Sequence, residues 1–158
     1  MKLIRADKDL HVFHLGKKEK QLLLAVLDRY PLIPSAHQPL TQSVASGQAE
    51  TDQRLLDEAL AELRRENKRQ LKSLLSDPRR WHDTETGCRV TLSSADVEWL
   101  LQVLNDVRVG SWIILGAPEK DLWDFKLDKE TAPHAWAMEA AGIFQTDLLA
   151  ALQRGNAT

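Results

Sequence analysis

Residues 99–115 limit the fold of this chain most strongly, because their side chains are apolar on nearly every side of a helix. Ser93 and Asp96 precede them and suit the start of a helix, where free backbone N–H groups need acceptors. Gly116 and Pro118 predict its end. A helix that is apolar all round lies at the centre of its domain or buries its second face against another chain. We therefore expect this helix to be central.

Three polar side chains interrupt this apolar helix, namely Asn105, Asp106 and Arg108. The helical period places Arg108 about 40° from Leu104, the centre of the expected core face, and Asp106 on the opposite side. Side chains two residues apart on a helix do not meet, so Asp106 and Arg108 each need another partner. We expect a buried polar network that includes Asn67, because Asn67 also interrupts an apolar helix face. The candidate partners of Arg108 on other helices are Glu62, Glu66, Asn67, Gln70 and Glu139.

The remaining periodicity predicts an α+β fold, a mostly helical single domain over residues 1–158 with about four helices and a small antiparallel β-sheet. A chain of 158 residues is long enough for one hydrophobic core. Residues 31–49 contain three prolines and no charged side chain, which predicts a long loop. The predicted strands cover residues 1–5, 10–15 and 88–92, and the predicted helices cover 17–29, 50–75, 93–115 and 132–153.

The helices at 50–75 and 132–153 each show one apolar face. For the first helix, the residues expected to face the core are Leu56, Ala59, Leu60, Leu63, Leu71 and Leu74. For the second, they are Trp136, Ala137, Ala140, Ala141, Phe144, Leu148 and Leu152. The alanines of the second helix predict the close approach of another helix.

Composition argues against several classes of protein. The formal net charge is −2, so no strong field favours nucleic acid or acidic lipid. A single cysteine, Cys88, excludes an internal disulfide framework. No unbroken apolar stretch of the sequence approaches the length of a membrane span. We expect a cytoplasmic protein with no membrane partner.

No residue pattern predicts a catalytic, cofactor or metal site. His11 and His14 lie three apart in a predicted strand, so they point to opposite faces and do not share a metal. Cys88 has no neighbouring base that would make it a nucleophile. The chain also lacks a glycine-rich turn after a strand, which a phosphate-binding loop requires.

Two segments suggest contacts with other molecules. The basic residues of 64–80 are the only indication of nucleic-acid binding, and interspersed glutamates on the same helix explain them more simply. Leu122, Trp123 and Phe125 lie within a charged segment. They either fold back onto the core, which we favour, or form an interaction surface.

The run WLLQVLNDVRV, with Trp99, Leu104, Asn105, Asp106 and Arg108, resembles the W-L-x-x-L-N-D-x-R-L signature of an uncharacterised bacterial family, catalogued as domain of unknown function two-zero-one-seven. The order of the predicted elements is also similar. The segment 110–112 and the segment 117–130 depart from the family pattern. The resemblance implies a fold but no activity, together with a link to Clp-type proteolysis as an accessory or adaptor protein.

The leading hypothesis is a non-enzymatic interaction protein with a protein partner, which self-associates through the helix at 93–115 or that at 132–153. The first alternative is a small-molecule or enzymatic site in which Arg108 holds a carboxylate or a phosphate, groups that match the guanidinium fork. The second alternative is nucleic-acid binding through residues 64–80.

Overall fold

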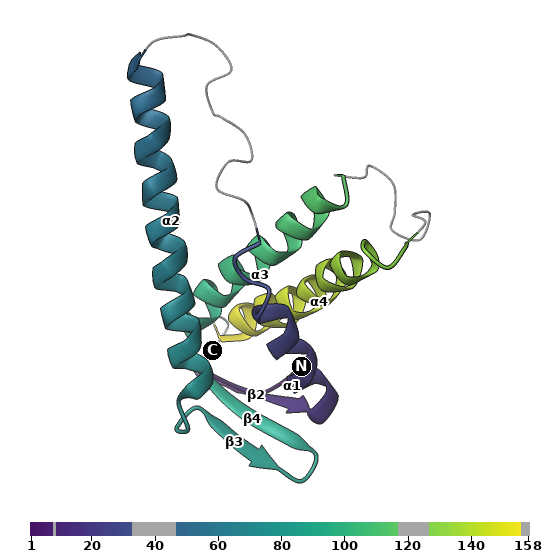
Figure 1. The fold of residues 1–158 in the computed structure, drawn as a ribbon. Coiled ribbons are helices and arrows are strands. Elements are labelled where there is room, and N and C mark those ends of the chain that lie inside the picture. The colour runs from purple at the N-terminus through teal and green to yellow at the C-terminus, as the bar shows by residue number, and fades with distance from the viewer. Residues whose placement is uncertain (8, 33–46, 117–126, 156–158) are drawn as a thin grey trace.

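The structure is a computed structural model, and it describes residues 1–7, 9–32, 47–116 and 127–155. The chain has the predicted α+β architecture, with four helices and one antiparallel sheet in these residues. Figure 1 shows three of the helices close to the sheet and one long helix that extends beyond it. None of the helices in the described ranges is long and apolar enough to cross a membrane.

The sheet contains four strands in the order β1-β2-β4-β3, and every neighbouring pair is antiparallel. Its strands are β1 (Lys2–Ala6), β2 (Leu10–Gly16), β3 (Trp81–Thr84) and β4 (Gly87–Ser93). The first, second and fourth were predicted. Strand β3 was not predicted, and it is a short edge strand that pairs with β4 through Trp81 opposite Val90 and Thr84 opposite Gly87.

Alternation along β2 and β4 supplies one wall of the core. Phe13 and Leu15 are fully buried on β2, and Val90 and Leu92 are buried on β4. The two strands pair in register from Leu10 opposite Ser93 to Gly16 opposite Gly87. Side chains of alternate residues point to the same face of a strand, so this register aligns the apolar side chains of both strands.

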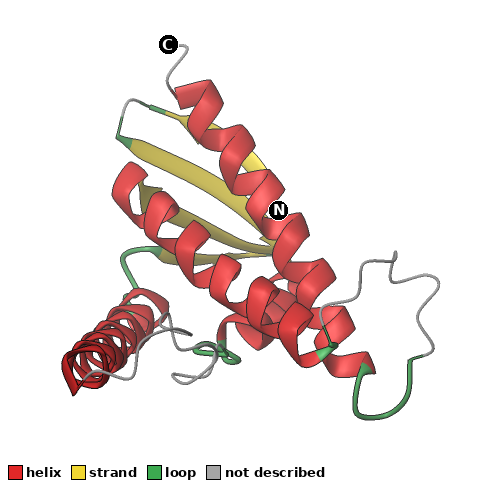
Figure 2. Cartoon of the chain, turned by 90° about the horizontal axis from the view of Figure 1, so that it is seen from above, coloured by secondary structure: helices red, strands yellow, loops and turns green. Residues whose placement is uncertain are grey.

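Helix α3 (Ser94–Ile114) and helix α4 (Ala132–Gly155) lie side by side over one face of the sheet (Figure 2). The predicted start of α3 is confirmed, since the Ser93 hydroxyl accepts a hydrogen bond from the Asp96 N–H at 3.1 Å and the Asp96 carboxylate accepts from the Ser93 N–H at 2.9 Å. The buried alanines of α4 face the core, as expected. Trp136 does not, because its side chain is 43% exposed.

Helix α1 (Lys17–Leu27) follows β2 directly. Its first turn is stabilised by Glu19, whose carboxylate accepts a hydrogen bond from the Gly16 N–H at 2.8 Å. Its buried residues are Leu23, Val26 and Leu27. Together with Tyr30, which is 4% exposed, they close the side of the core next to α3 and α4.

Helix α2 (Gly47–Ser76) is the element that departs most from expectation. The predicted core face is buried only at Leu71 and Leu74, near the C-terminal end, whereas Leu63 is 56% exposed. A helix of 30 residues is about 45 Å long at 1.5 Å per residue, and Leu71 and Leu74 lie within about 8 Å of its C-terminal end. Its first half therefore extends beyond the sheet and the other helices (Figure 1).

Candidate functional site

Arg108 does not lie in the core. Its side chain is exposed, and it donates a long hydrogen bond of 3.4 Å to the Gln145 side chain of α4. The predicted burial was wrong because the core face of α3 is rotated towards Val103 and Gly110, both of which are buried. This rotation of about 40° moves Arg108 to the edge of the core face.

Asn105 and Asp106, the two polar neighbours of Arg108 on α3, are not fully buried in the core either. Asn105 is exposed, so the prediction of a core anchor was wrong at this position. Asp106 is half-buried, and its Oδ1 atom accepts a hydrogen bond of 2.8 Å from the Leu32 N–H. Asp106 thereby fixes the chain that leaves α1 against α3, at a position outside the core face of this helix.

Asn67 is half-buried and joins two other elements to α2. Its Nδ2 atom donates a hydrogen bond of 3.0 Å to the Tyr30 hydroxyl, and its Oδ1 atom accepts one of 3.0 Å from the Trp99 indole N–H. The amide oxygen and one amide hydrogen are therefore satisfied within the chain. This arrangement positions α2 at the point where it leaves the core, and it contains no Arg108.

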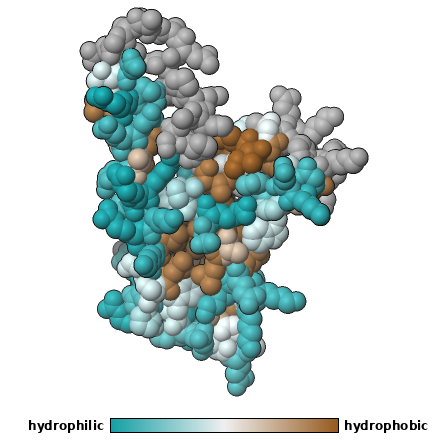
Figure 3. Space-filling view, in the orientation of Figure 1, coloured by the Kyte–Doolittle hydropathy of each residue, from teal (hydrophilic) through white to brown (hydrophobic). Residues whose placement is uncertain are grey.

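One concave surface among the described residues is a groove between α3 and α4. We call it the α3–α4 groove, with a volume of about 710 Å³. It is lined by Arg108, Val109 and Trp112 from α3 and by Met138, Glu139, Gly142, Ile143, Gln145, Thr146 and Leu149 from α4. Its apolar side chains reach the surface: Ile143 is 56% exposed, Leu149 49% and Trp112 41%. Figure 3 shows hydrophobic surface exposed on the part of the molecule that contains α3 and α4.

Two charges of opposite sign lie on this groove. Arg108 contributes a guanidinium and Glu139 an exposed carboxylate, and neither forms an ion pair with any of the residues that the structure describes. Gln145 helps to position Arg108. Its amide nitrogen donates a hydrogen bond of 3.3 Å to the Leu101 carbonyl, and its amide oxygen accepts one from Arg108. The groove therefore presents an apolar centre with one cation and one anion.

Within the part of the chain that the structure describes, the groups that could carry nucleophilic or metal chemistry lie apart from one another. Burial raises the pKa of the Cys88 thiol, which is opposite to what a nucleophile needs. His11 is 1% exposed, whereas His14 on the other face of β2 is half-buried and contacts the Thr86 hydroxyl. Within the described ranges, no three His, Cys, Asp or Glu side chains could hold a metal ion together.

The basic residues of α2 are partly neutralised along the helix. Arg65 pairs with Glu62 at the next turn, and Arg69 contacts Glu66 at 2.8 Å and Glu62 at 3.3 Å. Exposed pairs of this kind favour a solvated helix face over a surface for nucleic acid. The residues Leu122, Trp123 and Phe125, the predicted interaction surface, lie outside the described residues.

The sequence analysis missed most of the residues that form the α3–α4 groove. Ile143 and Leu149 lie away from the alanine face of α4, and they are apolar at positions where a surface helix usually carries polar side chains. That excess of apolar residues on α4 was the signal in the sequence. These residues line a groove only because α4 packs beside α3, and a helical wheel does not show which helices pack together.

A comparison with protein-family models, with curated proteins and with solved structures finds no match for this chain. The similarity of the 99–109 segment to the uncharacterised bacterial family therefore stays a prediction.

Proposed function

We propose that this protein is a non-enzymatic interaction protein whose α3–α4 groove binds an amphipathic helix of a partner protein. The observation that carries this proposal is the exposure of Trp112, Ile143 and Leu149 around one hollow. Apolar side chains gathered at a surface groove are typical of helix-in-groove recognition, in which anchors at every third or fourth residue enter the hollow.

The shape of the groove favours a helix over a second copy of the same surface. Two copies related by a two-fold axis present the same hollow to each other, and a hollow does not fill a hollow. A helix is convex and fits between α3 and α4. Arg108 and Glu139 then define its charge, since the partner helix needs a carboxylate for the guanidinium and a cation for the carboxylate beside its apolar anchors.

The resemblance to the bacterial family adds a class of partner to this proposal. It favours a component of Clp-type proteolysis, with the present chain as the accessory protein. This part depends on the resemblance, whereas the groove and its helical partner depend on the geometry.

The test compares the proteins that copurify with the wild-type chain and with two groove variants, Ile143→Asp and Leu149→Asp. The matched control is Ile4→Asp, because Ile4 is similarly exposed, at 51%, on strand β1 away from the groove. A captured protein is then purified, and its Kd is measured by calorimetry. We expect each groove variant to bind at least about tenfold more weakly, since buried apolar anchors dominate such interfaces. Equal affinities of wild type and groove variants would overturn the proposal.

A second candidate function follows from Arg108, which lines a hollow of several hundred cubic ångströms. A guanidinium at such a site suits a small carboxylate or phosphate ligand. Calorimetric titration with inorganic phosphate and with citrate tests this candidate directly. Binding that is abolished in Arg108→Lys, which keeps the charge but loses the fork, supports the small-ligand site over the helix site.

A further inference from the structure

Helix α2 has an exposed side that the α3–α4 groove does not use. Its C-terminal turns join the core through Leu71 and Leu74, while Leu55 and Leu63 are each 56% exposed. Most of the stability of a helix in a protein comes from packing one face against the rest of the molecule, yet none of residues 50–70 of α2 is buried. The face of α2 seen in Figure 3 is hydrophilic over most of its length. The order of its charges therefore indicates which molecule this face could bind.

The charges of α2 are divided between its two halves. Residues 50–63 contain five carboxylates and one arginine, whereas residues 64–72 contain five basic side chains and one glutamate. The first half is therefore strongly negative and the second half strongly positive. Two such helices attract each other when they run antiparallel and repel each other when they run parallel in register.

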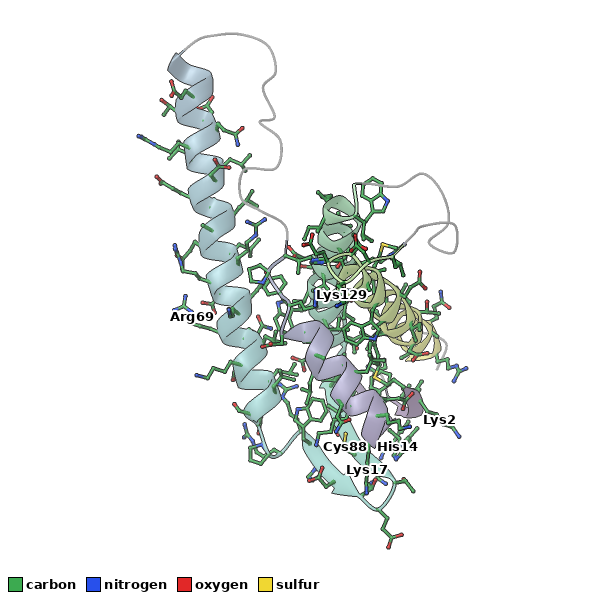
Figure 4. The ribbon with its side chains drawn as sticks, turned by 45° about the vertical axis from the view of Figure 1, so that its right-hand side comes forward. Lys2, His14, Lys17, Arg69, Cys88 and Lys129 are labelled. Carbon is green, nitrogen blue, oxygen red and sulfur yellow. The ribbon has the colours of Figure 1, made fainter. Side chains whose placement is uncertain are left out.

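Four of these charged side chains lie on one flank of α2, within about 60° of one another on a helical wheel. They are Glu58, Glu62, Arg65 and Arg69, and their side chains are 59–68% exposed. The order along the flank is acid, acid, base, base. Figure 4 shows Arg69 pointing away from the sheet and the other helices, so this flank is accessible to another molecule.

The spacing of the four residues is symmetric about the middle of the helix. Glu58 and Arg69 are equally distant from the midpoint between residues 63 and 64, and so are Glu62 and Arg65. In an antiparallel pair with its two-fold axis at this point, equivalent flanks face each other. Glu58 then meets Arg69 of the second copy, and Glu62 meets Arg65 of the second copy, each contact occurring twice.

Two exposed apolar residues lie beside this charged flank. Leu55 and Ala59 are about 50° and 90° from the centre of the flank on the helical wheel, whereas the exposed Leu63 lies about 130° from it, near the core side. Leu55 can pack on the aliphatic part of the Lys72 side chain of the second copy, and Ala59 permits close approach of the two helices. The side of α2 that carries Leu71 and faces the core lies about 180° from the charged flank, so the core does not block the pairing.

We propose that two copies of this chain associate through an antiparallel pair of α2 helices, held by the Glu58–Arg69 and Glu62–Arg65 contacts between copies. The ion pairs that Glu62 forms with Arg65 and Arg69 within one chain are exposed, and such pairs contribute little to stability. They are therefore easily exchanged or shared between the two copies. The resulting dimer carries two α3–α4 grooves, both remote from the α2 contact.

The test measures the mass of the full-length chain by sedimentation equilibrium over a range of concentrations. Three variants are compared with the wild type: Glu58→Lys/Glu62→Lys, Arg65→Glu/Arg69→Glu, and the swap variant that combines all four substitutions. The first double variant has four positive charges on the flank, and the second has four negative charges. The swap variant carries both signs again, in the reversed order base, base, acid, acid. Circular dichroism checks that each variant is folded.

We expect the wild type and the swap variant to form dimers and the two double variants to dimerise at least about tenfold more weakly. An equimolar mixture of the two double variants should form a heterodimer, because their flanks attract. A wild type that is monomeric at tens of micromolar, or double variants that dimerise as the wild type does, would overturn the proposal. A folded swap variant that fails to dimerise would do the same. Ile143→Asp separates this proposal from that for the groove, since it leaves the α2 dimer intact.

Discussion

The Trp99 indole N–H and the Oδ1 atom of Asn67 form a hydrogen bond of 3.0 Å that joins α3 to α2. The same asparagine donates to the Tyr30 hydroxyl, so one half-buried amide holds three parts of the chain together. Asn67 lies one turn before Leu71, which is buried in the core. The contact therefore helps to fix the direction in which the first half of α2 extends.

Replacement of Asn67 by alanine should lower the free energy of unfolding by about 1–3 kcal/mol, because it leaves the Trp99 N–H and the Tyr30 hydroxyl without their partner. Urea denaturation followed by tryptophan fluorescence measures this change. Asn105→Ala is the matched control, since Asn105 is exposed, and it should change stability by less than about 0.5 kcal/mol. Equal effects of the two substitutions would show that the Asn67 contacts contribute nothing.

His11 should be replaceable by leucine with a gain in stability. Its side chain is 1% exposed, and neither ring nitrogen has a hydrogen-bond partner among the described residues. A buried polar group without a partner costs free energy that an apolar side chain of similar size does not. We expect His11→Leu to raise the free energy of unfolding by about 1–2 kcal/mol, measured by urea denaturation. A loss of more than about 1 kcal/mol would indicate a contact that the imidazole makes and leucine does not.

Acid should weaken the start of α3 through Asp96. Burial acts to raise the pKa of this carboxyl group, but hydrogen bonds from Ser93 and Arg80 outweigh it and the pKa lies below its ordinary value. Because the pKa is lower in the folded than in the unfolded chain, the ionised carboxyl group stabilises the fold above the unfolded pKa. That stabilisation is lost as pH falls through the folded pKa.

The free energy of unfolding should therefore fall between about pH 5 and about pH 3, and Asp96→Asn should show a smaller fall over the same range. Denaturation with urea at several pH values measures both slopes. Glu139→Gln removes one exposed carboxylate elsewhere and serves as the control, which should keep the wild-type slope. An Asp96→Asn variant with an unchanged slope would contradict the role of this cap.

Two glycines should respond to alanine in opposite directions. A Cβ atom on Gly87 would lie 2.0 Å from the Leu15 carbonyl oxygen on the neighbouring strand, so Gly87→Ala must displace β2 from β4. We expect a loss of more than about 3 kcal/mol, or failure to fold. A Cβ atom on Gly142 meets no atom within 4 Å, and alanine favours a helix interior, so Gly142→Ala should gain about 0.5–1 kcal/mol. Thermal unfolding of both variants shows whether the melting temperature falls for Gly87→Ala and rises for Gly142→Ala.

The parts of the fold that depend on local chemistry were predictable from sequence. Ser93 and Asp96 gave the start of α3, and alternation around Phe13 gave β2. Strand β3 was missed because WHDT is short and shows no apolar alternation, and its pairing with β4 is a tertiary event. The exposure of Leu63 was missed for a similar reason, since an apolar face indicates what a helix can bury and not whether a neighbour reaches it.

The candidate site was predictable only in part. The run around Arg108 was singled out, but the wheel was centred about 40° from the true core face, and this error placed an exposed guanidinium inside the protein. Asn67 was recognised as needing partners, whereas Tyr30 and Trp99 could not be named. The α3–α4 groove depends on which faces of two helices meet, and no pattern within either helix contains that information.

The central claim of this account is that the α3–α4 groove binds a helix of another protein, and site-specific photocrosslinking tests it most directly. A photoreactive amino acid replaces Ile143 in the groove or, as a control, Arg54 on the exposed first half of α2. After irradiation in cells of the source organism, crosslinked peptides are identified by mass spectrometry. The account predicts that position 143 captures one amphipathic helical segment of one protein and that position 54 does not. Crosslinks from position 143 only to a second copy of this chain, or the same products from both positions, would contradict it.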